Sequence, residues 1–244
     1  MRNLRLDICY DGTRYKGWQR LSSGDNTIQG KLETVLTRLL DEPIQVSGSG
    51  RTDAGTHAKG QVANFHCNSN MTCDEILSGL RMYLPEDIGV YSCRDVSQRF
   101  HARLNAKEKT YRYRLWNSTA PCVFDRRYVY TDTRHFDLVA MRNASEYFIG
   151  THDFSAFCGN KHMKKSTVRA IRSFDIATNE NEIVFTVTGN GFLQHMVRIM
   201  VGTLLEVGTG DRKADSIPGL FGKSRENAGP SVPACGLCLM EVSY

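Results

Sequence analysis

The sequence has no long hydrophobic run, no disordered-looking tract and too few cysteines for a small disulfide scaffold. No apolar stretch approaches the roughly 20 residues that cross a bilayer. Charges between Met1 and Asp7 also interrupt the apolar core that a signal peptide needs. Charged residues make up 23% and hydrophobic residues 41% of the 244 residues, which is the composition of a folded chain. These absences predict an ordinary folded protein that resides in the cytoplasm and has no membrane contact.

The eight cysteines are spread through the chain, and we expect most of them to be reduced core residues. Cys235 and Cys238 have the C-x-x-C spacing of a metal or redox site. They lie in an apolar, strand-like stretch, however, and no second pair completes a zinc site. We therefore predict no metal. A Cys/His metalloprotein is the alternative, and it would contain stoichiometric zinc.

The net charge of +5 is concentrated in basic clusters. One cluster, between residues 94 and 114, consists of Arg94, Arg99, Arg103, Lys107, Lys109, Arg112 and Arg114, with only two acidic residues among them. The second consists of Lys161, Lys164, Lys165, Arg169 and Arg172, with no acidic residue between its ends. A single basic run is often only solvated surface. Two separated clusters indicate a large polyanion as the partner.

Hydrophobic periodicity predicts the order β-α-β-β-α-β in the first half of the chain. Apolar and polar residues alternate from Leu4 to Tyr10, and apolar residues then follow with helical spacing from Ile28 to Leu39. The remaining predicted elements are strands at residues 44–48, 61–66 and 88–91, and a helix that begins with a capping box at Thr72 and Glu75 and ends at Pro85.

The second half predicts the same order of elements. In its first strand, Tyr111, Tyr113 and Leu115 alternate with Arg112 and Arg114. The other predicted elements are a helix at 136–148, strands at 168–176 and 183–188, a helix at 196–207 with Gly208 as its C-cap, and a strand at 236–242. The expected fold is α+β, with two ferredoxin-like halves, residues 1–105 and 106–244, joined around a central, largely antiparallel sheet with a cleft between them.

Asp53 lies between two of the predicted strands, in a segment that has three glycines within eight positions, Gly48, Gly50 and Gly55. Glycines allow a backbone to bend and to approach a ligand closely, and loops of this kind often carry function. An aspartate followed by small residues is also ordinary turn chemistry. Local chemistry alone favours the turn over a catalytic role.

The segment Gly50-Arg51-Thr52-Asp53-Ala54-Gly55-x-His57-Ala58 resembles the catalytic motif of the TruA family of tRNA pseudouridine synthases. Other segments are similar to further family motifs and occur in the family's order. They are Tyr10-Asp11-Gly12-Thr13 with Gly17-Trp18-Gln19, Phe100-His101-Ala102-Arg103, Tyr111-Arg112-Tyr113, His152-Asp153-Phe154-Ser155, Phe192-Leu193-x-His195-Met196-Val197-Arg198, and Gly236-Leu237-x-Leu239. Ordered motifs along nearly the whole chain are far more specific than any one of them, and the duplicated order of elements agrees with the family's two-domain fold.

The resemblance implies that Asp53 attacks the uridine while its glycosidic bond is cleaved, after which the uracil rotates and rejoins the ribose through C5. This isomerisation needs no metal or other cofactor. Arg198, in an otherwise apolar helix segment, is implied as the counter-ion of Asp53, unless the helix turns it to solvent. Tyr111 is implied to stack on the flipped uracil, although a tyrosine in a strand is more often a core residue.

The remaining implied contacts concern the RNA. Arg51 is the second candidate for the counter-ion, or it contacts a phosphate beside the target nucleotide. Phosphate contacts are also expected from the second basic cluster and from Arg103, Arg112 and Arg114. Leu237, in the last motif, is expected to contact the substrate.

The implied substrate is the anticodon arm of tRNA, and the implied assembly is a homodimer with no DNA partner. Two alternatives stay open. One is action on ribosomal RNA by an enzyme of the same family. The other is a non-catalytic RNA-binding module in which Asp53 only forms a turn.

Overall fold

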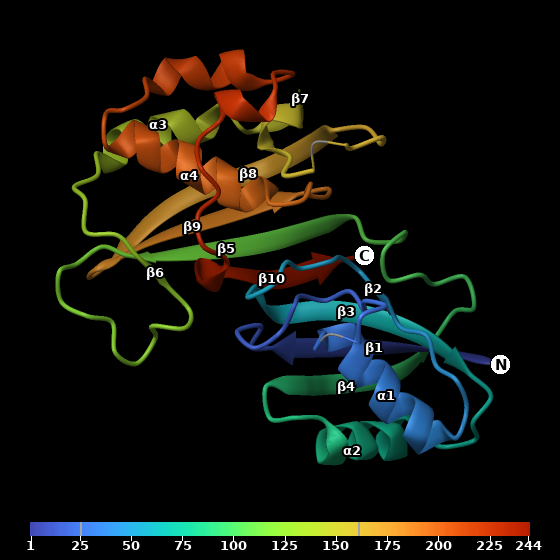
Figure 1. The fold of residues 1–244 in the computed structure, drawn as a ribbon. Coiled ribbons are helices and arrows are strands. Elements are labelled where there is room, and N and C mark those ends of the chain that lie inside the picture. The colour runs from blue at the N-terminus through green and yellow to red at the C-terminus, as the bar shows by residue number, and fades with distance from the viewer. Residues whose placement is uncertain (25, 161) are drawn as a thin grey trace. The chain divides into compact units, whose positions relative to one another are not determined.

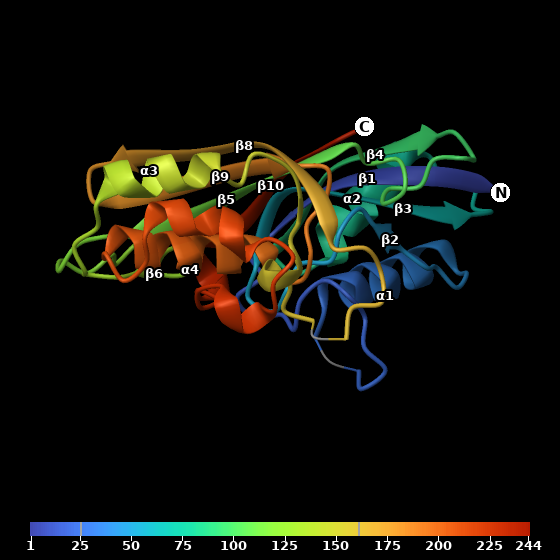
Figure 2. The same ribbon diagram turned by 90° about the horizontal axis from the view of Figure 1, so that it is seen from above.

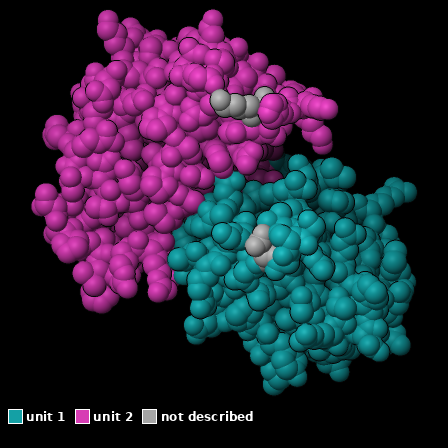
Figure 3. All heavy atoms as spheres, in the orientation of Figure 1, with its two compact units in different colours: residues 1–107, 238–244 teal, residues 108–237 magenta. Residues whose placement is uncertain are grey.

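The computed structural model describes residues 1–24, 26–160 and 162–244. These residues form two compact units, shown in different colours in Figure 3. Unit 1 comprises Met1–Lys107 and Cys238–Tyr244, and unit 2 comprises Glu108–Leu237. Both units combine helices with mostly antiparallel strands, which confirms the α+β class. Within the described ranges, no helix is long and apolar enough to cross a membrane.

Unit 1 is a sheet with the helices α1 and α2 packed against it (Figure 1). Its strands follow the order β4-β1-β3-β10, and β2 pairs with β3. The elements are β1 (Arg2–Tyr10), α1 (Ile28–Leu40), β2 (Ser47–Gly48), β3 (His57–Cys67), α2 (Cys73–Tyr83), β4 (Ile88–Val96) and β10 (Leu237–Ser243). β1 runs antiparallel to both β3 and β4, whereas β10 runs parallel to β3.

The periodicity of the first half is confirmed at the residue level. Leu4, Leu6 and Ile8 alternate along β1 and are all 0% exposed, because they point into the core beneath the helices. The capping box of α2 is also present. The Thr72 hydroxyl accepts from the Glu75 N–H, and the Glu75 carboxylate accepts from the Thr72 N–H.

The predicted strand at residues 44–48 is largely wrong, since only Ser47–Gly48 pairs as a strand. The reason lies in side chains of α1. The Ile44 N–H donates to the Thr37 hydroxyl over 3.1 Å, and the Val46 N–H donates to the Glu33 carboxylate over 3.0 Å. Ile44 and Val46 are buried as in a strand, but their backbone donors are satisfied by the helix and not by a neighbouring strand.

Unit 2 has α3 and α4 lying next to each other against its strands (Figure 2). Its strands follow the order β5-β9-β8-β7 and are antiparallel, while β6 pairs in parallel with β5. The main elements are β5 (Glu108–Trp116), β6 (Tyr130–Thr131), α3 (Leu138–Glu146), β7 (Gly150–Asp153), β8 (Val168–Asn179), β9 (Glu182–Gly189) and α4 (Met196–Gly208). Short 3-10 helices occupy Ser155–Phe157, Ala214–Leu220, Arg225–Asn227 and Ala234–Gly236.

The predicted helix at 196–207 is confirmed as α4, but Gly208 is not its C-cap. The helix includes Gly208, and Thr209 follows as the cap in a right-handed conformation. A Cβ atom on Gly208 would lie 2.5 Å from the sulfur of Met141 in α3. The glycine therefore permits close packing of two helices and does not supply a left-handed turn.

Candidate active site

The loop that carries Asp53 connects β2 to β3 and is fixed by the segment that follows β1. The Trp18 N–H donates to the Thr52 carbonyl over 3.0 Å, and the Gly55 N–H donates to the Tyr15 carbonyl over 3.3 Å. Trp18 is 1% exposed, so these bonds join the loop to the core of unit 1. The loop has a fixed backbone on both sides of Asp53.

Gly17 makes this close approach possible. Its φ angle is +97°, a conformation that other residues rarely adopt, and a Cβ atom would lie 2.6 Å from the Thr52 carbonyl oxygen. The Gly17-Trp18 motif and the Asp53 motif are thus two halves of one packed structure.

Gln61 of β3 supports the loop from beneath and is 0% exposed. Its Oε1 accepts from the Ser49 hydroxyl over 2.7 Å, and its Nε2 donates to the Gly50 carbonyl over 3.1 Å and to the Tyr10 hydroxyl over 3.3 Å. The Tyr10 and Thr52 hydroxyls share a further bond of 2.8 Å. Burial raises the pKa of Tyr10 far above its usual range, so this hydroxyl keeps its proton. Sequence reasoning missed Gln61, whose only signal is an amide within an apolar strand.

Asp53 itself is half-buried, and its carbonyl accepts from the Thr56 N–H over 3.1 Å. The turn at this point is therefore made by the backbone of Asp53. Arg51, two residues earlier, is exposed. His57 is 5% exposed, and its Nδ1 accepts from the Gly12 N–H over 3.1 Å, which fixes the start of β3.

The last sequence motif lies beside the start of β3. Cys238 pairs with His57, and Leu239 pairs with Ala58, in the parallel contact between β10 and β3. Leu237 begins β10 and is 5% exposed. Residues that are far apart in the sequence thus meet directly after the Asp53 loop.

Tyr111 and Arg198 belong to unit 2, whereas Asp53 belongs to unit 1. Tyr111 lies in β5 and is 7% exposed. Its ring contacts the edge of Phe192 at a centroid distance of 5.1 Å and an interplanar angle of 83°. This contact fixes the orientation of the ring. Phe192 was part of a recognised motif, but the sequence did not predict this contact.

Arg198 lies in α4, where its neighbours on both sides are buried and it is half-buried. The Arg198 Nε donates to the Val232 carbonyl over 2.7 Å, and the Val232 N–H donates back to the Arg198 carbonyl over 3.3 Å. The neighbouring Pro233 carbonyl accepts from the Tyr113 hydroxyl over 2.9 Å. We call residues 229–233 the strap, because they run across α4 and orient Arg198. Sequence reasoning did not identify the strap.

The basic residues differ in how their charge is compensated. Arg114 is bonded to two carboxylates, over 2.9 Å from its Nε to Glu182 and over 2.7 Å from its Nη2 to Asp125. These bonds raise the pKa of Arg114, and they leave it poorly placed for the phosphate contact expected from the sequence. Arg103, Arg112, Lys164 and Lys165 are exposed, and Lys161 lies outside the described residues.

The two cysteines of the C-x-x-C pair contact different backbone groups. The Cys235 thiol donates to the Val129 carbonyl over 3.4 Å, and the Cys238 thiol donates to the Leu239 carbonyl over 3.7 Å. Among the described residues, no group of three or more His, Cys, Asp or Glu side chains is arranged to hold a metal ion.

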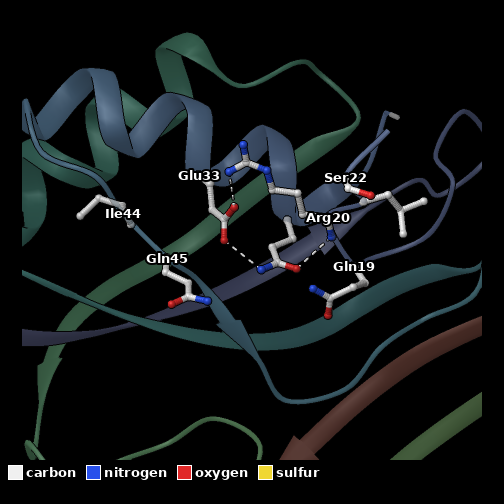
Figure 4. Close-up of a pocket in the computed structure, with 8 residues that line it drawn as sticks. Gln19, Arg20, Ser22, Glu33, Ile44 and Gln45 are labelled. Atoms are coloured by element: carbon white, nitrogen blue, oxygen red, sulfur yellow. Dashed lines mark hydrogen bonds and ion pairs between the residues drawn. The ribbon is translucent and has the colours of Figure 1, made fainter. Parts of the chain in front are cut away.

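A cavity of about 450 Å³ lies beside α1 in unit 1 (Figure 4). Its lining includes the buried Glu33, whose carboxylate accepts from Arg20 over 3.0 Å and from Gln29 over 2.8 Å. The same carboxylate accepts the Val46 N–H. Its hydrogen-bonding capacity is used within the fold, so this cavity is a structural junction and not a second candidate site.

Comparison with known proteins defines the class of protein to which this site belongs. The family described as tRNA pseudouridine synthase matches residues 8–105 and 144–244. A tRNA pseudouridine synthase A 1 of Clostridium tetani (strain Massachusetts / E88) is 49% identical, and a tRNA pseudouridine synthase A of Bacillus sp. (strain KSM-64) is 46% identical. A tRNA pseudouridine synthase A 2 of Bacillus cereus (strain ZK / E33L) is 41% identical. Each alignment covers 100% of both chains.

These matches define an isomerase that acts on uridine in RNA. The chain belongs to the tRNA pseudouridine synthase family, as the motifs around Asp53 predicted.

Proposed function

We propose that this tRNA pseudouridine synthase uses Asp53 as its reacting carboxylate and modifies uridines in the anticodon arm. The observation that carries the proposal is the set of hydrogen bonds that hold the loop around Asp53, which we call the frame. Gln61 and the segment from Tyr10 to Trp18 hold the loop through buried hydrogen bonds. A carboxylate on a fixed loop meets the requirement for a pre-positioned nucleophile.

In this mechanism the carboxylate attacks an electron-poor carbon of the nucleoside, C1′ of the ribose or C6 of the base. The bond between N1 and C1′ breaks, the uracil rotates, and C5 joins C1′. The bond between Asp53 and the nucleoside breaks, so the free carboxylate is restored. C5 loses its proton to the solvent and N1 gains one, and the product is therefore an isomer of the substrate. No oxidant, metal or nucleotide is consumed.

Arg198 and Tyr111 complete the proposed site from unit 2. Arg198 is held by the strap through the Val232 carbonyl, and we assign it as the counter-ion of Asp53. Tyr111 is the platform that replaces the stacking lost when the uridine leaves its helix. The two roles require that both units present their residues to one cleft, and each half of the fold is proposed to be ferredoxin-like.

The RNA contacts are proposed for Arg51 and Arg103, which are both exposed, and for Leu237. Arginines of this kind position a nucleic acid through its phosphates and do not read its sequence. We further propose that the protein works as a cytoplasmic homodimer. Ribosomal RNA is the alternative substrate.

The test uses a tRNA transcript labelled with tritium at C5 of uridine, because rejoining through C5 releases the label into water. We expect the wild-type protein to release it and Asp53→Asn to release none, while its Kd for tRNA stays within about twofold, since one amide replaces one carboxylate of the same shape. Asp41→Asn is the matched control, because Asp41 is exposed and its left-handed conformation (φ 52°) suits asparagine.

Each outcome separates one claim from another. No release by the wild-type protein from any tRNA or ribosomal RNA would support a non-catalytic RNA-binding module. Release by Asp53→Asn at the wild-type rate would refute only the catalytic role of the Asp53 carboxylate. Release from ribosomal RNA but not from tRNA would overturn the proposed target.

A further inference from the structure

The segment between β5 and β6 in unit 2 carries an apolar ring that is almost fully exposed. Phe124 is 95% exposed, and the adjacent Val123 is 55% exposed. The segment forms the yellow-green loop beside β6 in Figure 1. Adjacent exposed apolar side chains form a small apolar patch, and patches of exposed apolar surface are a feature of interaction sites.

The backbone of the loop around Phe124 is held in place by hydrogen bonds. The Asp125 carboxylate accepts from Arg114 over 2.7 Å, and the Asp125 carbonyl accepts from the Tyr128 N–H over 2.7 Å. At its start, the Trp116 indole N–H donates to the Ala120 carbonyl over 2.6 Å. Because Asp125 is drawn inward on one side of Phe124, the phenyl ring is held out in water by a defined backbone.

The charge beside the ring is positive. Arg126 and Arg127 are exposed, and the neighbouring acidic group, Asp125, is already bonded to Arg114. A cavity of about 490 Å³ lies at the same segment and is lined by Pro121, Cys122, Val123, Arg126, Thr131 and Thr133, among others. An exposed aromatic ring, flanking cations and an apolar recess together match the chemistry of an unstacked nucleotide.

We propose that Phe124 is a stacking contact for a base of the RNA substrate, with Arg126 at the phosphate beside it. The proposal rests on tRNA as the substrate. Tyr111 and Trp116 are five residues apart in β5, which corresponds to roughly 17 Å along the strand. The base of the target uridine is assigned to Tyr111, so we assign Phe124 to another nucleotide. A polyanion complements the exposed Arg126 and Arg127 of this loop, and a contact with a second copy of this chain is the outcome that the test below separates from it.

The test compares Phe124→Ala with the wild-type protein and with Tyr83→Ala, which removes an exposed aromatic ring (64% exposed) from unit 1. The Kd for tRNA is measured by filter binding, and the pseudouridine-forming rate is measured in a single turnover at saturating tRNA. We expect Phe124→Ala to raise the Kd about 5- to 160-fold, as for the loss of one stacked base, and to leave the saturated rate unchanged. Phe124→Trp, which keeps an aromatic ring at this position, should bind tRNA as tightly as the wild-type protein does.

A second measurement tests the cation. Arg126→Gln should reduce the slope of log affinity against log salt concentration by about 0.7 to 0.9, as for the loss of one phosphate contact. An unchanged Kd for Phe124→Ala, or an equal loss for Tyr83→Ala, would overturn the proposal. So would a change of oligomeric state in Phe124→Ala by sedimentation, which would assign the loop to a contact between copies. The Kd for tRNA is measured apart from the catalytic rate. A failure of the proposed Asp53 mechanism would therefore change the rate and leave the test of Phe124 valid.

Discussion

Replacing Gln61 by leucine tests whether the frame around Asp53 governs catalysis. Leucine has nearly the same size as glutamine but neither an amide donor nor an acceptor. The substitution removes the bonds to Ser49, Gly50 and Tyr10 in a site that is 0% exposed. It does not change Asp53 itself or any residue that is proposed to contact the RNA.

The size of the effect follows from these bonds. Each neutral hydrogen bond contributes about 1 kcal/mol to the free energy of unfolding, so the loss of three amounts to about 3 kcal/mol. For a protein of this size, a loss of about 3 kcal/mol lowers Tm by about 6 to 12 °C. Because the Gly50 carbonyl loses its anchor, the loop should move, and a displacement of about 1 Å in a catalytic group can cost about 100-fold in rate.

The assay is tritium release at saturating tRNA, together with tRNA binding and thermal unfolding. For Gln61→Leu we expect the rate to fall about 10- to 100-fold, while the Kd for tRNA stays within about twofold. Gln45→Leu is the matched control, because Gln45 is an exposed glutamine of the same unit. A Gln61→Leu protein with the wild-type rate and Tm would refute the view that this network positions Asp53.

Two further substitutions probe the same supports. Gly17→Ala should lower the free energy of unfolding by about 1 to 3 kcal/mol and slow tritium release, since its φ of +97° and its contact with the loop backbone both disfavour a side chain. Gly24→Ala, at φ +75° with no neighbouring atom of the described residues within 4 Å, should keep the wild-type rate, and equal rates for both variants would contradict the steric explanation. Tyr113→Phe removes the bond to the Pro233 carbonyl and should slow single-turnover catalysis through Arg198 while tRNA affinity is kept. Weaker tRNA binding at an unchanged rate would assign Tyr113 to the RNA surface instead.

Much of the fold could be predicted from the sequence, because local signals there agree with the tertiary structure. The capping box at Thr72 and Glu75, and the alternation from Leu4 to Ile8, are short-range patterns with one physical meaning. The predicted strand at residues 44–48 is largely wrong because its local pattern and its tertiary contacts disagree. Their apolar pattern is that of a strand, but their N–H groups are satisfied by side chains of α1, which no local pattern reveals.

The candidate site could be predicted only through resemblance to a family. Local chemistry favoured a turn at Asp53, and the structure does contain a backbone turn from Asp53 to Thr56. What distinguishes this turn is its long-range support. Gln61 and Trp18 lie far from each other in the sequence and meet only in the folded unit. Such contacts depend on strand register and leave no spacing pattern in the sequence.

The catalytic role of Asp53 is tested most directly by mapping pseudouridine at nucleotide resolution in cells that lack this protein. The cells receive either the wild-type chain or Asp53→Asn at equal protein levels. We expect pseudouridines in the anticodon arm of tRNA to return with the wild-type chain and to remain absent with Asp53→Asn. Their return with Asp53→Asn would contradict the assignment of Asp53 as the reacting carboxylate.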